Sequence, residues 1–596
     1  MKAILANNQK TCQTLLRKLS AAKVIGFDTE SSGPPLLKKK MLNVYCSRLV
    51  GFSIAFADHS AYYVPVAHYR GNVHYAQWYP IICAVSRVPQ VWVHNWKHDS
   101  FVLRNSSLPV PPCSAMRDSM VACWLASLQG QKGYGLKDLS LTHLGVNAPS
   151  FEDVVGKKGQ FSSVDPQAGL AYASLDALSC MRLGRMAYDK LDDIERKRFT
   201  LLDMPMVGVL GHIEESGIAI DSLGLTSLFA DLQHRLDKCQ VKWTALIGDV
   251  CMNSPKQLRE ALYDTGIWST DGVPLTPKGL PSTNKEAMEI HVARETGIGR
   301  KLAKNRQEYQ ELSKIVSTYT MGLVEMAGQY PDGRLHPSFH QTGTRTGRLS
   351  CSGPNLQQIP SHSELGLRVK RCFVPSEGHV FVSADYSQIE LRVLAHYCPG
   401  GMFERAYKEG KDIHQQTADF VGCSRTVAKT LNFATIYGAG PKKLAAKMGV
   451  KYRDARQFLK SMNEAYPEIE EYKQRMVDAA DRDGYVRTLL GRRRYLPEMQ
   501  AEGPMRWKGE RLATNTPIQG TAADIMNRAM VNLYARLLGR DGIIVGQVHD
   551  ELLVEVPEHA AEDVGRELKE ILENAVELNV PLVADPVVCR NWAESK

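Results

Sequence analysis

The stretch IIVGQVHDELLVEV, residues 543–556, limits the possible folds of this chain more than any other. Its apolar runs, 543–548 and 552–556, are rich in Val, Ile and Leu, and only the triplet His-Asp-Glu separates them. This pattern predicts two antiparallel strands joined by a short turn. Tight hairpin turns usually contain Gly or Asn, because these residues tolerate positive φ, but this turn has three titratable side chains and no glycine. It is therefore either a solvated turn or a metal or catalytic site at the end of rigid strands.

The whole chain must form several domains, because 596 residues are too many for one hydrophobic core. Hydrophobic residues make up 44% and charged residues 23%, an ordinary globular balance that excludes disordered and fibrous classes. The net charge of +9 fits a nucleic-acid partner without requiring one, since local clusters of charge matter more than the sum.

The N-terminus and the cysteines indicate the compartment. The first residues lack the apolar core of a signal peptide and predict a short strand followed by a helix from about Gln9 to Leu19. No apolar run reaches the roughly 18 residues needed to span a bilayer, so we expect no membrane contact. The thirteen cysteines include no CxxC pair, which indicates reduced thiols and no zinc knuckle. We expect a cytoplasmic protein, in the nucleoid or in an infected bacterial cell, rather than an organellar one.

Three separate segments contribute carboxylates with the spacing of a metal site. In VIGFDTES (24–31) an apolar strand places Asp28 and Glu30 on one face, because side chains alternate along a strand. HNWKHD and YASLD each hold a polar residue and an acid four residues apart, the spacing of one helix face: Asn95 with Asp99, and Tyr172 with Asp176.

These oxygen ligands suit Mg²⁺ or Mn²⁺. Two such ions about 4 Å apart can activate a water and stabilise a leaving 3′-oxygen in phosphodiester cleavage, and Tyr172 could orient that water. Each pair taken alone is better explained by a surface ion pair or a helix cap. His94 and His98 have the spacing of zinc ligands on a helix but lack a third ligand, so zinc is disfavoured.

The segment CSRTVAKTLNFATIYGAGP, residues 423–441, predicts a helix that Ser424 begins and Gly438 ends. One side of this helix is cationic in its first half and aromatic in its second half: Arg425, Lys429, Phe433 and Tyr437. A nucleoside triphosphate has the matching polarity, with phosphates at one end and a flat base at the other. An ordinary amphipathic helix with buried rings and solvated cations is the alternative.

A further acid follows the apolar strand in FVSADYSQIELR, residues 381–392. Asp385 ends this strand as Asp550 ends the first strand of the hairpin. If the two strand ends meet, their carboxylates could hold two Mg²⁺ ions, which would activate a 3′-hydroxyl and neutralise a triphosphate.

The motifs resemble those of two known families. The set DxE, NxxxD and YxxxD, with GYGLKDLS (133–140) before the third motif, resembles the 3′–5′ proofreading exonuclease superfamily. RxxxKxxxFxxxYG, DYSQIELR and VHDE resemble the fingers helix and motifs A and C of family A DNA polymerases, the bacterial and phage DNA polymerase I type. The resemblance runs from about residue 24 to residue 592. Two departures are Arg345, where the family often has a small residue, and Cys351, where Ser is common.

The resemblance implies an α/β multidomain fold in which a ribonuclease H-like 3′–5′ exonuclease domain precedes a right-hand polymerase domain with an antiparallel palm sheet. The expected boundaries are 1–192 for the exonuclease and 193–596 for the polymerase. Within the latter we expect the thumb at about 222–325, the palm at about 326–400 and 500–596, and the fingers at about 401–499. No 5′-nuclease domain is expected before the exonuclease domain.

The resemblance also assigns roles to particular residues. In the exonuclease site the metal-binding acids are Asp28, Glu30, Asp99 and Asp176, and Tyr172 positions the nucleophile. In the polymerase site the metal ligands are Asp385, Asp550 and the backbone of Tyr386, with Glu551 as a supporting acid and Lys429 as a proton donor. The nucleotide-binding residues are Arg425, Lys429, Phe433, Tyr437, Gln388 and Glu390, the last of which would exclude a 2′-hydroxyl. The DNA-binding residues are Arg348, Asn355, Gln357, Arg511, Asn515, Gln519 and His549. The run GRRRYLP (491–497) resembles a fingers loop, and its arginines also predict a phosphate-binding patch.

The implied activity is template-directed addition of dNTPs to a primer 3′-hydroxyl by two-metal nucleotidyl transfer, with 3′–5′ exonucleolytic proofreading, in DNA replication or repair. Each active site would take two Mg²⁺ ions, or Mn²⁺. The expected partners of this monomer are primer–template DNA, dNTPs and single-stranded 3′ ends. A nuclease that keeps a polymerase-like domain for duplex binding and a non-enzymatic clamp are the rival hypotheses. The clamp is disfavoured because unpaired buried carboxylates are costly.

Overall fold

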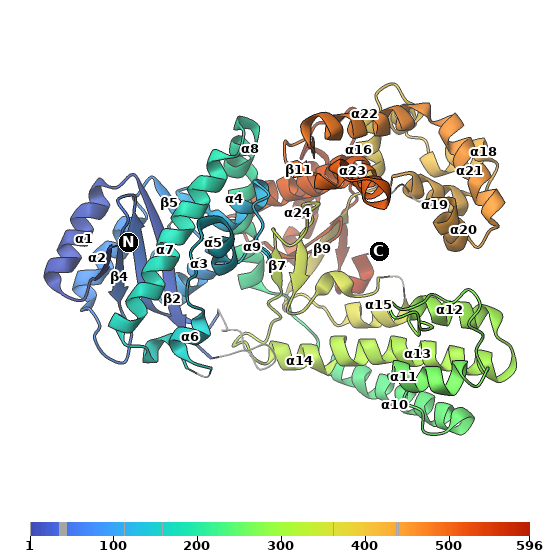
Figure 1. The fold of residues 1–596 in the computed structure, drawn as a ribbon, viewed down its shortest axis with the longest axis horizontal. Helices are drawn as coiled ribbons and strands as arrows, with labels where there is room; N and C mark the ends of the chain where they lie inside the picture. The colour runs from blue at the N-terminus through green and yellow to red at the C-terminus, as the bar shows by residue number, and fades with distance from the viewer. Residues whose placement is uncertain are drawn as a thin grey trace. The chain divides into compact units, whose positions relative to one another are not determined.

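We describe the fold from a computed structural model of the chain (Figure 1). It describes residues 2–34, 45–111, 114–157, 159–361, 363–436, 438 and 440–595. The chain forms two compact units, each of which is described by itself. The first comprises residues 1–216, 337–353 and 382–588, and the second comprises residues 217–336, 354–381 and 589–596.

The first unit begins with a six-stranded mixed sheet. The strand order is β1-β4-β3-β2-β5-β6, and the strands are β1 (Lys2–Leu5), β2 (Val24–Ser32), β3 (Arg48–Phe56), β4 (Ser60–Pro65), β5 (Gln90–Val93) and β6 (Met116–Asp118). Strands β2, β3 and β4 pair antiparallel, whereas β1 pairs parallel with β4 and β5 pairs parallel with β2 and β6. The predicted strand at 24–31 and helix at 9–19 are confirmed as β2 and α1 (Gln9–Ala21).

Helices surround this sheet, namely α2 (Tyr75–Val85), α3 (Trp96–Asn105), α4 (Ser119–Leu125), α5 (Leu136–Leu144), α6 (Phe151–Val155) and α7 (Pro166–Asp189). The long helix α7 crosses β2, β3, β4 and β5 (Figure 1). Its close approach requires glycine at position 26 of β2, because a Cβ atom there would lie 2.0 Å from the carbonyl oxygen of Ala177. This contact fixes α7 beside the strand that carries Asp28 and Glu30.

A connecting run of helical turns leads out of the sheet domain: α8 (Asp193–Arg198), the π-helical turn η2 (Phe199–Asp203) and α9 (Met204–Ser216). It is held by a buried charge network. Arg198 donates to Asp203 (Nε–Oδ2, 3.0 Å) and pairs with Asp524 (Nη1–Oδ2, 2.7 Å), and Thr488 donates to the same Asp524 carboxylate at 2.6 Å. Each buried charge therefore has a partner, as burial requires.

A second sheet, most of whose residues belong to the first unit, has the order β12-β13-β9-β14. Its strands are β9 (His379–Asp385), β12 (Ile543–Val548), β13 (Glu551–Pro557) and β14 (Val587–Cys589). The predicted antiparallel hairpin is confirmed, and Val548 pairs with Glu551. The turn is one residue shorter than expected, because Glu551 already belongs to β13. His549 takes the left-handed conformation (φ +57°) that such a turn demands, without help from glycine.

Helices of the same unit accompany this sheet: α16 (Ile389–Tyr397), α17 (Met402–Lys408), α18 (Ile413–Val421), α19 (Arg425–Ile436), α20 (Pro441–Met448), α21 (Tyr452–Ala465), α22 (Pro467–Asp483), α23 (Gly503–Leu537) and α24 (Ala561–Glu573). Two short antiparallel ribbons complete it, β7 (Ser338–His340) with β8 (Ser350–Ser352) and β10 (Tyr485–Arg487) with β11 (Arg493–Tyr495). The helix predicted around 425–437 is α19. Ser424 caps it, because its Oγ accepts a hydrogen bond from the Val427 amide at 3.3 Å, and Gly438 has φ +59°.

The second unit is helical: α10 (Ser222–Ile247), α11 (Pro255–Leu258), α12 (Lys285–Arg294), α13 (Gly297–Tyr319), α14 (Met321–Ala327) and α15 (Glu364–Arg371). The long helices α10 and α13 pack together. One apolar cluster includes Trp243, Leu262, Trp268 and Leu302. No helix in the described part of the chain is both long and apolar enough to cross a membrane.

Candidate active sites

The first candidate site lies where β2 meets α7. Ligand oxygens of Asp28, Glu30 and Asp176 all lie within 4.8 Å of one another, as the acid-x-acid spacing on one strand face predicts. Among the described residues, this is the group of three that could hold a metal ion. Glu30 and Asp176 are buried and Asp28 is half-buried. The sequence thus brings two neighbouring acids of one strand to an acid 146 residues further along the chain.

Asp99 approaches this cluster without joining the close group. It lies in α3, and its Oδ1 accepts hydrogen bonds from the Thr29 amide (3.1 Å) and the Thr29 hydroxyl (2.6 Å). The expectation that Asn95 shares a helical face with Asp99 is wrong, because α3 begins at Trp96 and Asn95 precedes it in the left-handed conformation (φ +62°). Asparagine is one of the few residues that adopts this conformation readily.

Lys137, at the start of α5, supplies the cation of this site. Its ammonium group pairs with Asp176 and lies 3.9 Å from the centroid of the Tyr172 ring. Tyr172 and Asp176 project from the same side of α7, four residues apart. Lys137 therefore contacts both residues that the third motif predicts.

The carboxyl groups of this site resist ionisation. Burial raises the pKa of Asp28 well above its usual range, and the neighbouring charges of Asp99, Glu30 and Asp176 raise it further. Burial and then Asp176 likewise raise the pKa of Glu30. Burial raises the pKa of Asp99 to about 7, although the two hydrogen bonds from Thr29 oppose this. Lys137 lowers the pKa of Asp28, Glu30 and Asp176, yet its single charge does not outweigh burial. The one positive charge of Lys137 is therefore too little to balance the four acids of this site.

These residues fit a divalent cation. The buried Oε1 atom of Glu30 has no hydrogen-bond partner among the described residues, which is costly unless a ligand completes the site. The donor set is entirely carboxylate oxygen, which suits a hard cation. The alternative zinc pair does not fit, because both ring nitrogens of His94 are engaged, by the Ser119 hydroxyl (2.9 Å) and the Tyr134 carbonyl (3.0 Å).

The second candidate site lies at the ends of β9 and β12. The Tyr386 amide donates a hydrogen bond to the Asp550 carbonyl at 3.1 Å. Asp385 is the last residue of β9 and immediately precedes Tyr386, which makes this contact with the hairpin turn. Asp385 is exposed and the Asp550 side chain is 31% exposed. The turn that the sequence left ambiguous thus places its acid beside another acidic strand end.

Polar neighbours hold the remaining acids of this site. The buried Glu551 carboxylate accepts a hydrogen bond from the Ser383 hydroxyl of β9 (2.9 Å). Arg348 donates to Glu390 (Nη2–Oε1, 2.7 Å) and lies 3.6 Å from Asp550 Oδ1. Arg348 thus lies between Glu390, the acid expected below the sugar, and Asp550, an expected metal ligand.

The other nucleotide-binding candidates lie on α16 and α19. Gln388 begins α16 with φ +54°, and its Oε1 accepts a hydrogen bond from the Tyr407 hydroxyl (2.8 Å). On α19, Arg425 and Lys429 are exposed and Phe433 is half-buried near the His414 ring. Arg425 pairs with Asp412 (Nε–Oδ2, 2.7 Å). Tyr437 lies outside the described residues.

The DNA-binding candidates fall in both compact units. In the first unit, Arg511, Asn515 and Gln519 lie on α23, and the buried Asn515 Oδ1 has no hydrogen-bond partner among the described residues. His549 is exposed in the hairpin turn. Asn355 and Gln357 belong to the second unit, where the Gln357 amide donates to the Asn355 side chain at 3.1 Å. Lys137 belongs to the motif GYGLKDLS, but its role was not predicted, because residue spacing does not predict the contact between α5 and Asp176 of α7.

Comparisons with known proteins identify the family. The family described as DNA polymerase family A matches residues 223–594, and the family described as 3′-5′ exonuclease matches residues 4–192. The chain belongs to DNA polymerase family A and carries an exonuclease-family segment before the polymerase segment. This agrees with the predicted fold class, an exonuclease domain followed by a polymerase domain.

Individual relatives agree with this family. DNA polymerase I of Borreliella burgdorferi is 32% identical over 97% of this chain, and DNA polymerase I of Pseudomonas aeruginosa is 35% identical over 97%. The chain spans 63% and 64% of the length of these two relatives. A solved structure, the POL domain of Pol1 from M. smegmatis in complex with DNA primer-template and dNTP, is similar with a TM-score of 0.85 and 26% identity, and the match covers 99% of each chain.

Proposed function

We propose that this chain is a DNA-directed DNA polymerase with a separate 3′–5′ exonuclease site. It would add dNTPs to a primer 3′-hydroxyl on a DNA template and remove mispaired ends. The observation that carries the proposal is the junction of two acidic strand ends through the hydrogen bond from Tyr386 to Asp550, in a chain of this family. The relative with bound primer-template and dNTP supports these partners.

The proposal includes the domain boundaries expected from the sequence. Residues 1–192 would form the exonuclease domain and residues 193–596 the polymerase domain, with the thumb, palm and fingers as predicted. The family matches at 4–192 and 223–594 support this division.

Two Mg²⁺ ions at each site, or Mn²⁺, would supply Lewis-acid activation of the attacking oxygen and charge neutralisation of the leaving group. Asp385, Asp550 and the Tyr386 backbone would hold them at the polymerase site, and Asp28, Glu30, Asp176 and Asp99 at the exonuclease site.

The residues of α19 would bind the incoming triphosphate. Arg425 and Lys429 are exposed cations on one helix face, and Lys429 could transfer a proton to the leaving pyrophosphate. The Arg425–Asp412 pair is exposed on both sides, with side chains 53% and 41% accessible. Such a pair contributes little to stability, so an anionic phosphate could replace Asp412 at small cost. The rings of Phe433 and Tyr437 would contact the sugar and base.

Arg348 and Lys137 would position groups at the two sites. The hydrogen bond from Arg348 fixes the Glu390 carboxylate, where it would sterically exclude a 2′-hydroxyl. In the exonuclease site, Lys137 fixes Asp176 and covers the Tyr172 ring. Tyr172 would then present its hydroxyl to the attacking water.

Primer extension with Mg²⁺ tests this function. The protein is incubated with a 5′-labelled primer on a DNA template, with and without the four dNTPs, and the products are resolved on a gel. We expect longer products with dNTPs and shorter products without them. Shortening alone would favour a nuclease that keeps a polymerase-like domain for duplex binding, and no reaction would favour a clamp.

A further inference from the structure

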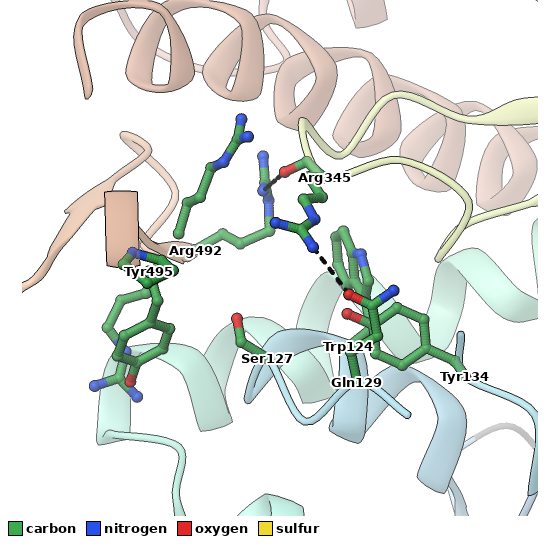
Figure 2. A pocket seen from close by; sticks show the side chains of 10 residues that line it. Trp124, Ser127, Gln129, Tyr134, Arg345, Arg492 and Tyr495 are labelled. Atoms are coloured by element: carbon green, nitrogen blue, oxygen red, sulfur yellow. Dashed lines mark hydrogen bonds between the residues drawn. The ribbon is translucent and has the colours of Figure 1, made fainter. Parts of the chain in front are cut away.

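A pocket of about 210 Å³ lies in the first unit (Figure 2), and its lining includes none of the acids of the two candidate sites. Three segments form it: the loop after α4, the segment before β8, and the residues of and around β11. Its lining consists of Trp124, Ser127, Gln129, Tyr134, Arg345, Arg492, Arg493, Arg494, Tyr495 and Pro497. Four arginines line this pocket, and no carboxylate does.

Two of the four arginines have carboxylate partners behind the pocket wall. Arg492 is buried 3.6 Å from Asp524 (Nε–Oδ1), and Arg493 pairs with Glu195. Their charges are therefore compensated by the buried core. Arg492 also donates to the Arg345 carbonyl at 3.2 Å, which ties the segment before β8 to the arginine run (Figure 2).

The other two arginines have no ion pair with a carboxylate among the described residues. Arg345 donates to the Gln129 side chain (3.0 Å), and Arg494 donates to the Thr516 hydroxyl (3.0 Å). Burial lowers the pKa of Arg494, and the charges of Arg345 and Arg492 lower it further, although the carboxylate of Glu498 partly opposes them. The pocket thus concentrates like charge that an anion would relieve.

Aromatic rings complete the lining. The Arg492 guanidinium lies 5.4 Å from the Trp124 ring centroid, and the Arg493 guanidinium lies 5.4 Å from that of Tyr495. The Trp124 indole donates to the Thr344 carbonyl at 3.1 Å, so this ring is fixed. Tyr495 is 37% exposed, so part of its ring faces solvent, although the Tyr485 ring lies 5.6 Å from it. Cations for a phosphate and an open ring for a base together match a nucleotide unit of a single strand.

We propose that this pocket binds a phosphate and the adjoining base of single-stranded DNA, with Arg345 and Arg494 on the phosphate and Tyr495 under the base. The inference rests on the proposed function and adds a strand-holding site to it. Tyr134 of the pocket lining lies three residues before Lys137, which begins the α5 side of the exonuclease site by its ion pair with Asp176.

Binding of an oligothymidylate tests the proposal without catalysis. A fluorescein-labelled oligomer of about 12 nucleotides is titrated with the full chain in EDTA, and the anisotropy gives Kd at several salt concentrations. We expect Arg345→Ala to weaken binding roughly 3- to 10-fold and to reduce the salt slope by about 0.7, the loss of one phosphate contact to a single strand. Tyr495→Leu should weaken binding about fivefold or more and leave the salt slope unchanged.

Arg17→Ala is the matched control, since Arg17 is an exposed arginine on α1 that does not line the pocket. It should change Kd by less than about twofold, because exposed charges beyond a Debye length are screened. Thermal melting shows that each variant is folded. If Arg345→Ala and Tyr495→Leu both bind like Arg17→Ala, the proposal is wrong.

Competition distinguishes a DNA strand from a free nucleotide. Millimolar dTMP and inorganic phosphate should leave most of the oligomer bound to the wild-type protein, since each offers one contact. Complete displacement by dTMP would overturn the proposal and indicate a free-nucleotide pocket. A protein that extends and degrades primers, but whose pocket variants bind normally, keeps the proposed function and loses this inference. A protein that does neither reaction with Mg²⁺ loses the proposed function, whatever its oligomer binding.

Discussion

The two acidic sites of this chain differ in how far water reaches them. At the first site, Glu30, Asp99 and Asp176 are only 5%, 2% and 6% exposed, and burial raises the pKa of all three. At the second site, Asp385 is exposed and Asp550 is partly exposed. The first site is built into a sheet–helix junction, and the second is built at open strand ends.

The buried network of Arg198, Asp203 and Asp524 shows how buried acids are paired elsewhere in the same unit. Its acids are as buried as those of the first site, but they contact a buried arginine. The acids of the first site have only the partly exposed Lys137, whose side chain is 31% accessible. The buried acids of the first site have too few protein cations, which indicates a binding site for an external cation. Asp203 and Asp524 are paired with Arg198 and contribute to the stability of the fold.

Removal of one acid from the more exposed site tests whether the two sites act separately. Asp550→Ala should reduce primer extension by about 10³-fold or more, since the metals it would hold contribute several kcal/mol to the transition state. Degradation of a single-stranded 3′ end should continue. Both reactions are followed on one gel.

Asp541→Ala is the control for this variant, because Asp541 is an exposed acid just before β12 in the same hairpin. It should extend primers normally. Loss of both reactions in a folded Asp550→Ala protein would contradict the existence of two separate sites.

The reciprocal change removes the two acids of β2. The double variant Asp28→Ala, Glu30→Ala should lose 3′ degradation by a factor on the order of 10³ and retain extension of a matched primer. The measurement is the rate of shortening of a labelled single strand with Mg²⁺. Asp58→Ala, at an exposed position in the β3–β4 turn, is the control, and persistent degradation in the double variant would remove the first site from the proposal.

The sequence predicts the elements that carry the acids better than it predicts their surroundings. Strand alternation and helical spacing are local, so β2, β9, α19 and the hairpin follow from the residues themselves. The hairpin turn was less predictable, because His549 adopts positive φ where the preference for Gly and Asn argues against it. The general preference for Gly and Asn in tight turns therefore does not predict the residues of this one.

Contacts between distant segments were not predictable from spacing. Asp524 meets Arg198 across 326 positions of the chain, and no periodicity connects them. Gly26 reads as an ordinary residue in an apolar strand, yet the approach of Ala177 requires it. Lys137 contacts Asp176 from the first turn of α5, and the motif that contains Lys137 does not predict this contact. Tertiary packing decides all three contacts.

Stability measurements can distinguish the acids of the first site from those paired with Arg198. In EDTA at pH 8, Asp28→Asn should raise the free energy of unfolding by about 0.5–2 kcal/mol, because it removes a carboxyl group that is disfavoured by burial and by the acids around it. Asp524→Asn should lower it by roughly 3–5 kcal/mol, because it leaves the Arg198 charge only half paired. Urea unfolding gives both values.

The pH dependence has a definite sign for the first group. An acid whose pKa is raised in the folded state binds more protons there than in the unfolded state, so stability falls as pH rises from its ordinary pKa to its raised pKa. For Asp99 this window runs from about 4 to about 7. The increase in the free energy of unfolding caused by Asp28→Asn should therefore be smaller at low pH. A gain that is equal at pH 4 and pH 8, or a destabilisation, would contradict the raised pKa of Asp28, caused by burial and by its acidic neighbours, as the source of the effect.

The smallest expected effect belongs to Lys137, the cation that the buried site does possess. Lys137 lowers the pKa of Asp28, Glu30 and Asp176, so Lys137→Met should shift their ionisation to higher pH. Single-strand degradation should fall on the order of tenfold near pH 6.5 and recover as pH rises towards 9, because the ionised carboxylates hold the metals. Lys137→Arg keeps the charge and should keep the wild-type pH profile. A loss of equal size at every pH would mean that Lys137 acts on the DNA or on the Tyr172 ring, and not through the charge of the acids.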